Sequence, residues 1–539
     1  MKRIFSILTL CLLGISFLAA QSIQDEVNTH LKNLPFASFS IKVPTFPDRV
    51  FNIKDAGAVG DGVVKNTEAI NSTIKKCSEA GGGTVLVPAG LWLTAAITMQ
   101  SNVNLHLEAG AIIVFSSDIN DYPLIGDDFS RIQSLINGTG LKNVAITGKG
   151  IFNGNGDAWR PIKKEKLNEK QWKALIKTGE VSADGKMWYP RKGTIAAIEL
   201  KQNTPGSELK TREANEKVRL TMRPYLLNVE KVDGMLVEGI TLQNSPHITN
   251  MLRSIDGLVM KDVKVLNNWW SQNADGLDIS ACRNVLLYDC IVNTGDDGIC
   301  MKSSGNPEKG KFRLENIVIK DCQVFHGHGG FVIGSNTDGG MNNIYVSNCV
   351  FSWTETGLRF KSDVGRGGRV QNVFIENIYM KDIEKEAIIF DLAYQDKGAI
   401  TSADFKESQA KVPDINGISI KNVYSEGSKV AISIGGTEML NAKNLLFQNM
   451  IIQANEGVKA NFSENVTMDN VQIISKIKPA YRLSKVNGFT FRNIRNIPAD
   501  NYIKVLGETT KNISIENSDI KIEQIELLDN LPASTVKFK

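Results

Sequence analysis

The sequence predicts an all-β fold, a right-handed parallel β-helix in which short strands stack as a solenoid, with an N-terminal capping helix and inserted loops. Three observations predict it: a unit that recurs mostly every 21 to 32 residues, alternation of apolar residues within each unit, and Asn or Gly at each unit's start. The 539 residues are 42% hydrophobic and 22% charged, which is typical of a folded globular protein.

The repeated unit has the pattern of a half-buried strand that follows a tight corner. The unit at Asn284 reads Asn-Val-Leu-Leu-Tyr-Asp-Cys, so apolar residues alternate after a turn residue. Asn and Gly tolerate the left-handed backbone that such a corner needs. The units lack the spacing and the helical segment of leucine-rich repeats, so parallel strands stacked about 4.8 Å apart are favoured. The other units begin at Asn143, Gly234, Gly257, Asn316, Asn343, Asn372, Gly417, Asn444, Asn465, Gly488 and Asn512.

The N-terminal end of the repeat is preceded by a segment with helical spacing. Over residues 67–80, Ile70, Ile74 and Cys77 fall on one helical face. We expect this helix to cap the N-terminal end of the stack and to cover its open strand edge.

Two insertions interrupt the repeat, over residues 157–225 and 392–414, and we expect both to project from the stack as loops. From residue 160 to residue 223 there are 16 Lys or Arg and 8 Asp or Glu, so the larger insertion is basic by +8. Four aromatic residues accompany this charge: Trp159, Trp172, Trp188 and Tyr189.

The first 20 residues are predicted to be a secretory signal peptide. Lys2 and Arg3 precede an apolar run over residues 4–18, and small residues follow it. No later segment is long and apolar enough to cross a bilayer, so we expect no membrane span after removal of this peptide. Residues 21–539 are then expected to form a single β-helix domain that is exported, to the periplasm or as a secreted protein, and monomeric.

Charge and cysteine content narrow the classes of function. The chain has 62 Lys and Arg against 58 Asp and Glu, a net charge of +4, which is too even for a nucleic-acid-binding protein. Six cysteines follow the signal peptide, without CxxC or zinc-site spacing. Because Cys290, Cys322 and Cys349 recur at one position of the repeat, we interpret them as a buried column of small apolar side chains. One or two disulfides stay open for an exported chain.

Polar residues fall in register where the second strand of four successive units begins. Parallel stacking of these strands would gather the polar residues on one patch of roughly 10–15 Å, over about three turns. The strands are aligned on Gly276, Gly298, Gly330 and Gly357. The polar residues of the patch are Asp275, Asp296, Asp297, His328, Arg359 and Lys361.

The chemistry of this patch points to an acid and a base beside a receptor for an anion. Clustered carboxylates repel, which separates their pKa values and lets one stay protonated while others are ionised, as glycoside hydrolysis requires. Arg359 and Lys361 lie two residues apart on one strand and share a face, where they would bind a carboxylate. His328 lies between Gly327 and Gly329, which indicates close approach of a ligand.

Four ordered motifs resemble the NTD, DD, GHG and RIK motifs of the polygalacturonase-like glycoside hydrolases, family 28. They are Asn273-Ala-Asp275, Asp296-Asp297, Gly327-His328-Gly329 and Arg359-Phe-Lys361. Residues 55–90 are similar to the N-terminal signature of pectin-active β-helix proteins. The resemblance covers residues 50 to 480, with two departures from the motifs, Ala274 and Phe360.

The resemblance implies a role for each matching residue. Asp296 would be the general acid, Asp275 and Asp297 would activate the attacking water, and His328 would hold the acid in the right ionisation state. Asn273, Arg359, Lys361 and Tyr394 would bind substrate, with Arg359 and Lys361 on a galacturonate carboxylate near the cleaved bond. The family uses no metal or other cofactor, so neither is expected.

The implied reaction is inverting hydrolysis of α-1,4-linked galacturonic acid in a pectic polysaccharide or oligogalacturonide. The basic insertion would close one end of the groove, with its cations on a terminal galacturonate and its aromatic rings on sugar faces, which predicts exo action. An endo-polygalacturonase and a hydrolase of rhamnogalacturonan or xylogalacturonan stay open. So do a pectate lyase, because three Asp residues suit calcium, and a non-catalytic β-helix binding protein, which would not need three acids in register.

Overall fold

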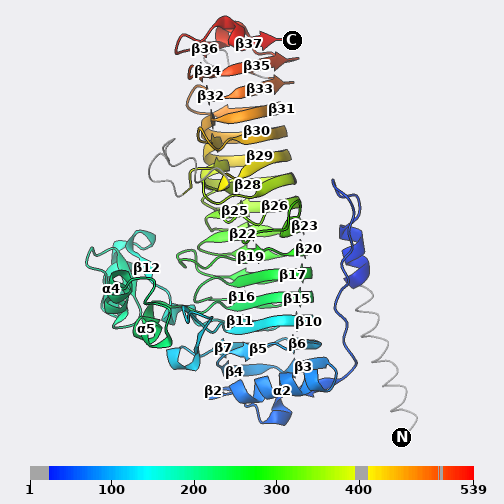
Figure 1. Cartoon of the computed structure of the whole chain (residues 1–539), viewed down its shortest axis with the longest axis vertical. Helices are drawn as coiled ribbons and strands as arrows, with labels where there is room; N and C mark the ends of the chain where they lie inside the picture. The colour runs from blue at the N-terminus through cyan, green and yellow to red at the C-terminus, as the bar shows by residue number, and fades with distance from the viewer. Residues whose placement is uncertain (1–22, 395–410, 496, 498–501) are drawn as a thin grey trace. The chain divides into compact units, whose positions relative to one another are not determined.

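A computed structural model describes residues 23–394, 411–495, 497 and 502–539 (Figure 1). Within these ranges the chain is mainly β-strand, and its large sheet is built from parallel pairings between strands of successive repeats. The predicted signal peptide and most of the 392–414 insertion lie outside the described residues. None of the described helices is both long and apolar enough to cross a membrane.

Contacts divide the chain into two compact units. Among the described residues, the first unit comprises residues 23–30, 40–278 and 290–296. The second comprises residues 31–39, 279–289 and the described residues from 297 to 539. The strand β19 (Leu277–Ser280) contains the boundary residue.

The first unit carries parallel strands together with the larger insertion. Its strands are β1 (Val50–Asn52), β2 (Asp61–Lys65), β3 (Gly83–Val87), β4 (Gly90–Thr94), β5 (Ile97–Thr98), β6 (Val103–Leu107), β7 (Ala111–Phe115), β8 (Leu124–Ile125), β9 (Arg131–Ile132), β10 (Ile136–Gly148), β11 (Ile151–Asn153), β12 (Ile162–Lys163), β13 (Glu180–Val181), β14 (Met187–Tyr189), β15 (Leu227–Glu238), β16 (Thr241–Gln243), β17 (Asn250–Lys261), β18 (Lys264–Leu266) and β21 (Ile291–Asn293). Its longer helices are α2 (Thr67–Glu79), α3 (Glu169–Leu175), α4 (Thr194–Asn203) and α5 (Arg212–Lys217). Five short 3-10 helices accompany them: η1 (Ile53–Ala56), η2 (Ile119–Asp121), η3 (Gly156–Ala158), η4 (Lys164–Lys166) and η5 (Arg219–Thr221).

The second unit consists of parallel strands in chain order (Figure 1). They are β20 (Arg283–Tyr288), β22 (Asp297–Lys302), β23 (Leu314–Lys320), β24 (Gln323–Phe325), β25 (Gly329–Ile333), β26 (Met341–Ser352), β27 (Leu358–Lys361), β28 (Arg369–Asp391), β29 (Asp414–Gly435), β30 (Ala442–Asn461), β31 (Ser463–Ser475), β32 (Tyr481–Ser484), β33 (Asn487–Arg492), β34 (Ile503–Leu506), β35 (Lys511–Glu516), β36 (Ile525–Leu527) and β37 (Val536–Phe538). Two 3-10 helices, η7 (Ile522–Gln524) and η8 (Ala533–Thr535), lie near its C-terminus.

The core of each unit is a set of columns in which one apolar residue lies on the equivalent residue of the next turn. In the first unit, Val144 pairs with Met235 and Met235 with Leu258, and all three are fully buried. One such column of the second unit runs through Val285, Ile317, Ile344, Val373, Ile418, Leu445, Val466, Phe489, Ile513 and Val536. Burying each such side chain stabilises the fold by about 1.5–3 kcal/mol.

The helix α2 confirms the predicted cap. It buries Ile70, Ile74 and Cys77, as the helical spacing predicted, and it packs against β3, β5 and β6, which are early strands of the first unit. An apolar helix face on these strands keeps their side chains from water and leaves less exposed strand edge for other chains to pair with.

The corner prediction is confirmed at every predicted unit start. All twelve residues, from Asn143 to Asn512, have φ between +52° and +79°. A second left-handed corner follows five residues after each of them, which the sequence analysis did not predict. At this corner Asn348, Asn377, Asn422, Asn449 and Asn470 each donate a side-chain hydrogen bond to the equivalent residue of the preceding turn, at 2.9–3.2 Å.

The larger insertion is folded, so the prediction of a projecting loop is wrong in this respect. Its three short strands form an antiparallel sheet in the order β12-β14-β13, and α3, α4 and α5 accompany it. Trp159, Trp172 and Trp188 are buried and Tyr189 is half-buried. Because the indoles are buried, they are not free to stack on sugar faces.

The six cysteines that follow residue 20 are buried. Cys322 and Cys349 donate S–H hydrogen bonds to the carbonyl oxygens of Lys320 and Ser347, at 3.1 and 3.3 Å. This agrees with a buried cysteine column, and no disulfide joins cysteines within the described ranges.

The asparagine corner gives a test of what stabilises the stack. Asn377 has a φ of 57°, donates to Asn348 and accepts from Asn422, both at 3.0 Å. We expect Asn377→Ala to lower the free energy of unfolding by about 2 kcal/mol, because it loses both hydrogen bonds and keeps an unfavourable left-handed backbone. Asn377→Gly relieves the backbone cost, so its loss should be smaller by about 1 kcal/mol. Urea unfolding of both variants measures this difference, and equal losses would contradict the role assigned to the corner.

Candidate active site

The acids of the first unit lie at the ends of two turns. Asp275 is buried, and its carbonyl oxygen accepts a hydrogen bond from the Thr249 N–H at 2.9 Å. Asp296 is half-buried, and its Oδ2 accepts the backbone N–H of Asn273 at 3.2 Å. Asn273 has the left-handed φ of 57° that turns its N–H toward this carboxylate. The structure therefore joins two of the predicted site residues by a direct hydrogen bond.

The glycine before Asp296 is required by close packing. A Cβ on Gly295 would lie 2.6 Å from the backbone nitrogen and oxygen of Ser271. Because backbone atoms cannot yield at that distance, only glycine lets this turn approach the preceding one. Gly295 thus fixes the distance between the turn that carries Asp296 and the preceding turn.

Arg223, at the end of the insertion, is a site residue that sequence reasoning missed. Its guanidinium donates hydrogen bonds to the carbonyl oxygens of Pro246 and Gln272, at 3.1 and 3.0 Å, and to Asn273 Oδ1 at 2.9 Å. Burial lowers the pKa of Arg223 to about 10 against the opposing charges of Asp296 and Asp275, so it stays cationic at neutral pH. In the sequence it was one of 16 basic residues, and nothing distinguished it from the rest.

Asp297 begins the second unit as a buried carboxylate held by two cations. Its side chain is paired with Lys361 (Nζ to Oδ2, 2.6 Å) and with Arg359 (a guanidinium nitrogen to Oδ1, 3.7 Å). Burial raises the pKa of Asp297, but the charges of Lys361 and Arg359 outweigh burial and hold it below the ordinary value. Asp297 is therefore ionised at neutral pH.

The lowered pKa of Asp297 means that the ion pair contributes to the stability of the fold. Because the folded-state pKa of Asp297 lies below its unfolded value of about 3.9, the pair stabilises the fold above that pH. The stabilisation is lost as the pH falls through the lower folded-state value. Attraction to Asp297 likewise raises the pKa of Lys361 well above its ordinary value, although burial opposes this.

Arg359 and Lys361 share a face, as predicted, and Phe360 points the other way. The Phe360 ring is buried on Phe390, with ring centroids 4.4 Å apart and planes 5° from parallel. Only 7% of Lys361 is exposed, and its ammonium is paired with Asp297. The pair with Asp297 leaves Arg359 as the more accessible of the two cations.

Tyr394 lies against the same cations. Its ring centroid is 5.0 Å from the Lys361 ammonium and 5.5 Å from the Arg359 guanidinium, and its backbone N–H donates to Ser362. An aromatic face beside two cations attracts them and restrains their positions. The structure thus brings Asp297, Arg359, Lys361 and Tyr394 together within the second unit.

His328 is oriented by a carboxylate that the sequence motif did not include. Its Nε2 lies 3.5 Å from Glu355 Oε1, and Glu355 Oε2 is paired with Lys385 at 2.7 Å. The two glycines that follow His328 are required by close packing. A Cβ on Gly330 would lie 2.4 Å from the buried Phe351 ring, and one on Gly329 would lie 2.6 Å from Val332.

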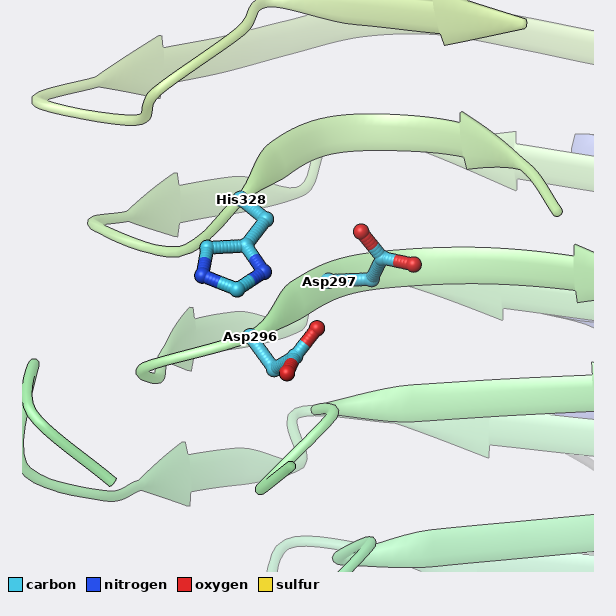
Figure 2. A group of neighbouring side chains, drawn as sticks. All are labelled: Asp296, Asp297 and His328. Atoms are coloured by element: carbon cyan, nitrogen blue, oxygen red, sulfur yellow. The ribbon is translucent and has the colours of Figure 1, made fainter. Parts of the chain in front are cut away.

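Asp296 and Asp297 are neighbours in the chain, and Figure 2 shows their side chains with that of His328. Within the second unit the Lys361 ammonium neutralises Asp297 and would repel a divalent cation at that carboxylate.

Comparisons with known proteins agree with the motifs. Residues 179–474 match the family model described as "Glycosyl hydrolases family 28", and residues 50–117 match "Rhamnogalacturonase A/epimerase, pectate lyase-like". An exo-poly-alpha-D-galacturonosidase of Dickeya chrysanthemi is 28% identical over 83% of this chain and 72% of its own length. An endo-polygalacturonase of Pectobacterium carotovorum is 24% identical over 68% of this chain and 80% of its own. The solved exopolygalacturonase of Thermotoga maritima aligns with a TM-score of 0.64 and 25% identity, over 84% of this chain and 96% of its own.

The ion pair between Lys361 and Asp297 gives a testable consequence. Lys361→Met leaves a buried carboxylate without its closest cation, so the pKa of Asp297 should rise and the acid limb of the pH–rate profile should move to higher pH. We also expect a loss of stability on the order of 3 kcal/mol at pH 7. Chemical unfolding and the pH dependence of kcat/KM measure the two effects.

The paired variant Asp297→Asn, Lys361→Met is the control for stability. It removes both charges, so it should recover most of the unfolding free energy that Lys361→Met loses. An unchanged pH profile and unchanged stability in Lys361→Met would show that the pair contributes nothing to either property.

Proposed function

The chain belongs to glycosyl hydrolases family 28, and we propose that it hydrolyses α-1,4 bonds between galacturonate residues of pectic polysaccharides with inversion at the anomeric carbon. The chain is a glycosidase by its family, and its polygalacturonase relatives support a pectic substrate. The observation that carries the galacturonate assignment is the cluster of Arg359, Lys361 and Tyr394 around the ionised Asp297. A cationic, aromatic-backed surface beside catalytic acids suits a sugar that bears a carboxylate.

In the proposed mechanism, Asp296 donates its proton to the glycosidic oxygen as the C–O bond breaks. Asp275 and Asp297 take a proton from the water whose oxygen attacks the anomeric carbon from the opposite face. The cations beside Asp297 support its role as base, because they keep it ionised. His328 acts on the ionisation of Asp296, and Glu355 supports the orientation of its ring.

The carboxylate of the substrate is proposed to meet Arg359, with Lys361 setting the local potential and Tyr394 lining the subsite. This refines the sequence-based assignment, because Lys361 is buried against Asp297. Asn273 is proposed to act in the substrate-binding surface through its contacts with Arg223 and Asp296.

The proposal extends to fold and location. We propose that the stacked turns of each unit are those of a right-handed parallel β-helix, which their parallel register supports. We propose also that residues 1–20 direct export to the periplasm or the medium, since Lys2, Arg3 and the apolar run after them have the features of a signal peptide.

A calcium-dependent lyase is the main alternative of another class. It would use the acids as calcium ligands, whereas Lys361 occupies Asp297 and disfavours a cation there. The products distinguish hydrolysis from elimination. Hydrolysis releases reducing ends and forms no unsaturated, ultraviolet-absorbing product, and its rate is unchanged by a chelator.

The role of Asp296 is tested by Asp296→Asn. The amide keeps the size of the side chain but has no acidic proton to donate, so kcat on polygalacturonate should fall by at least about 10²-fold with little change in stability. Asp321→Asn is the matched control, since Asp321 occupies a left-handed corner and accepts a hydrogen bond from Asn348, and it should keep wild-type rates. Near-wild-type turnover of Asp296→Asn would show that another group is the acid.

Exo action is the finer proposal, with mono-galacturonate released from the non-reducing end. It is supported by the folded basic insertion, whose Arg223 reaches the electrostatic environment of Asp275 and Asp296. Because the tryptophans of the insertion are buried, we assign recognition of the terminal galacturonate to its cations alone.

The mode of attack is read from viscosity. Viscosity of a pectate solution should fall slowly relative to the release of reducing ends, because terminal cleavage barely shortens a polymer. An early collapse of viscosity with mixed oligomers as first products would instead establish an endo-hydrolase.

A further inference from the structure

A groove of about 590 Å³ lies on one face of the second unit, across β26, β28, β29, β30 and β31. These strands follow one another in the stack (Figure 1). We call it the amide groove, because the five asparagines of the corner ladder, from Asn348 to Asn470, line one side of it. None of the proposed catalytic or substrate-binding residues lines it, and its volume is typical of a ligand-binding site.

The floor of the amide groove is one column of side chains that alternate with buried residues along their strands. The column consists of equal positions on successive turns: Tyr379, Tyr424, Ile451 and Gln472. Tyr424 is 40% exposed and Ile451 is 37% exposed. An aromatic and aliphatic strip therefore faces solvent in a unit whose core columns are already complete.

The two tyrosine rings of the floor are held in place before any ligand binds. They stack with centroids 6.1 Å apart and planes 9° from parallel. The Tyr379 hydroxyl donates to Glu426 at 2.6 Å, and the Tyr424 hydroxyl accepts a hydrogen bond from Gln453 at 3.2 Å. Each ring is thus fixed by a side chain of the next turn. Aromatic surface that is already ordered can contact the apolar face of a sugar ring at little cost in conformational entropy.

The asparagine side of the groove carries hydrogen-bonding groups at a regular spacing. Within the ladder, each amide uses at most one of its two N–H donors and one lone pair of its oxygen on its neighbours. Successive turns are about 4.8 Å apart, so donors and acceptors repeat along the groove at that interval. The hydroxyl and carbonyl oxygens of a glycan chain are suitable partners for them.

The amide groove is electrically neutral. None of the described residues that line it is charged. Lys381 and Glu426, each two residues beyond a tyrosine of the floor, are paired with each other at 3.4 Å. A carboxylate in the groove would lose its water without gaining a cation, which costs free energy. The groove therefore differs in charge from the candidate active site, where Arg359 and Lys361 lie beside Asp297.

The strands beneath the groove are interior strands, so an extended polypeptide is a poorer occupant than a glycan. The backbone N–H and C=O groups of β28, β29 and β30 are used by parallel pairings on both sides. A peptide laid across them could not add a strand to the sheet, and would lose the main-chain hydrogen bonds that give such partners their affinity.

We propose that the amide groove binds uncharged stretches of the pectic substrate, in which the galacturonate carboxyls are methyl esters. The ester methyl groups and the sugar faces contact Tyr379, Tyr424 and Ile451, and the hydroxyl and ester oxygens bond to the amides. The groove then holds the protein on esterified chain while the acids act on free galacturonate. The choice of polymer rests on the proposed function, whereas the preference for an uncharged glycan rests on the groove itself.

Calorimetric titration with two hexasaccharides tests the proposal. They are hexagalacturonate and its fully methyl-esterified form, and every protein carries Asp296→Asn so that neither is cleaved. Adding Tyr424→Ala should raise the dissociation constant of the ester about tenfold, because an aromatic contact is lost, and leave that of hexagalacturonate unchanged. Tyr424→Phe keeps the ring, so its dissociation constant for the ester should stay within about twofold of that of the parent.

Phe538→Ala is the matched control, because Phe538 is an exposed aromatic residue of β37 that does not line the groove. It should bind both hexasaccharides as the parent does. Ile451→Ser, on the next turn of the floor, replaces Tyr424→Ala if the latter does not fold, and it should also weaken binding of the ester alone.

Failure of this inference and failure of the proposed function give different results. If the parent does not bind the ester, or if Tyr424→Ala binds it as tightly as the parent does, the groove assignment is overturned and the hydrolase stands. If the wild type cleaves no galacturonan but the ester binds and Tyr424→Ala weakens it, the groove stands and the hydrolase is overturned. Light scattering tests for a second copy of the chain: a dimer that Tyr424→Ala dissociates would show that the groove is an interface and overturn the inference.

Discussion

In-register parallel pairing between successive turns constrains the other features of this protein. Each turn must place the same kind of residue at the same height, or a buried column is broken. The column from Val285 to Ile513 meets this condition with apolar residues at every level. The condition also applies to the corners, where each chain reversal needs a left-handed residue. Asn meets it twice, by tolerating that backbone and by hydrogen bonding to the corner of the turn before.

The same register gathers charge at one place. Because Asp297 pairs with Gly329 on the next turn, and Arg359 lies on the turn after that, carboxylate and cations meet without any unusual backbone. Burying these charges costs free energy, and their pairing offsets that cost. Asp297 would be unfavourable as a buried anion alone, and Lys361 as a buried cation alone, but each lowers the cost of the other.

The insertion adds to the repeat a group that the repeat cannot supply. Arg223 is held by two backbone carbonyl oxygens and by Asn273, so its position is fixed before any substrate arrives. A preorganised cation stabilises an anionic ligand without first having to be ordered. The tryptophans of the insertion contribute differently, because they are buried and stabilise the fold by their packing; Trp159 packs on Tyr122, which lies outside the insertion.

The sequence by itself determined the parallel strands, the left-handed unit starts, the capping helix and the opposite faces of Arg359 and Phe360. All of these are local or periodic properties, and a period of two within a strand or one turn within a repeat is visible in the order of residues. The prediction that the motif residues lie together rests on the same register, since equal positions in successive parallel turns are neighbours.

Only the tertiary structure decided the contacts that join different segments. Arg223 lies about 50 residues before Asn273, at no repeat position, and only the fold of the insertion brings them to 2.9 Å. The commitment of Lys361 to Asp297 and of Glu355 to His328 depends on burial and on side-chain direction, which a pattern of letters does not specify. The need for glycine at position 330 is likewise set by the Phe351 ring of the next turn, because packing inside a stack depends on the neighbouring turn.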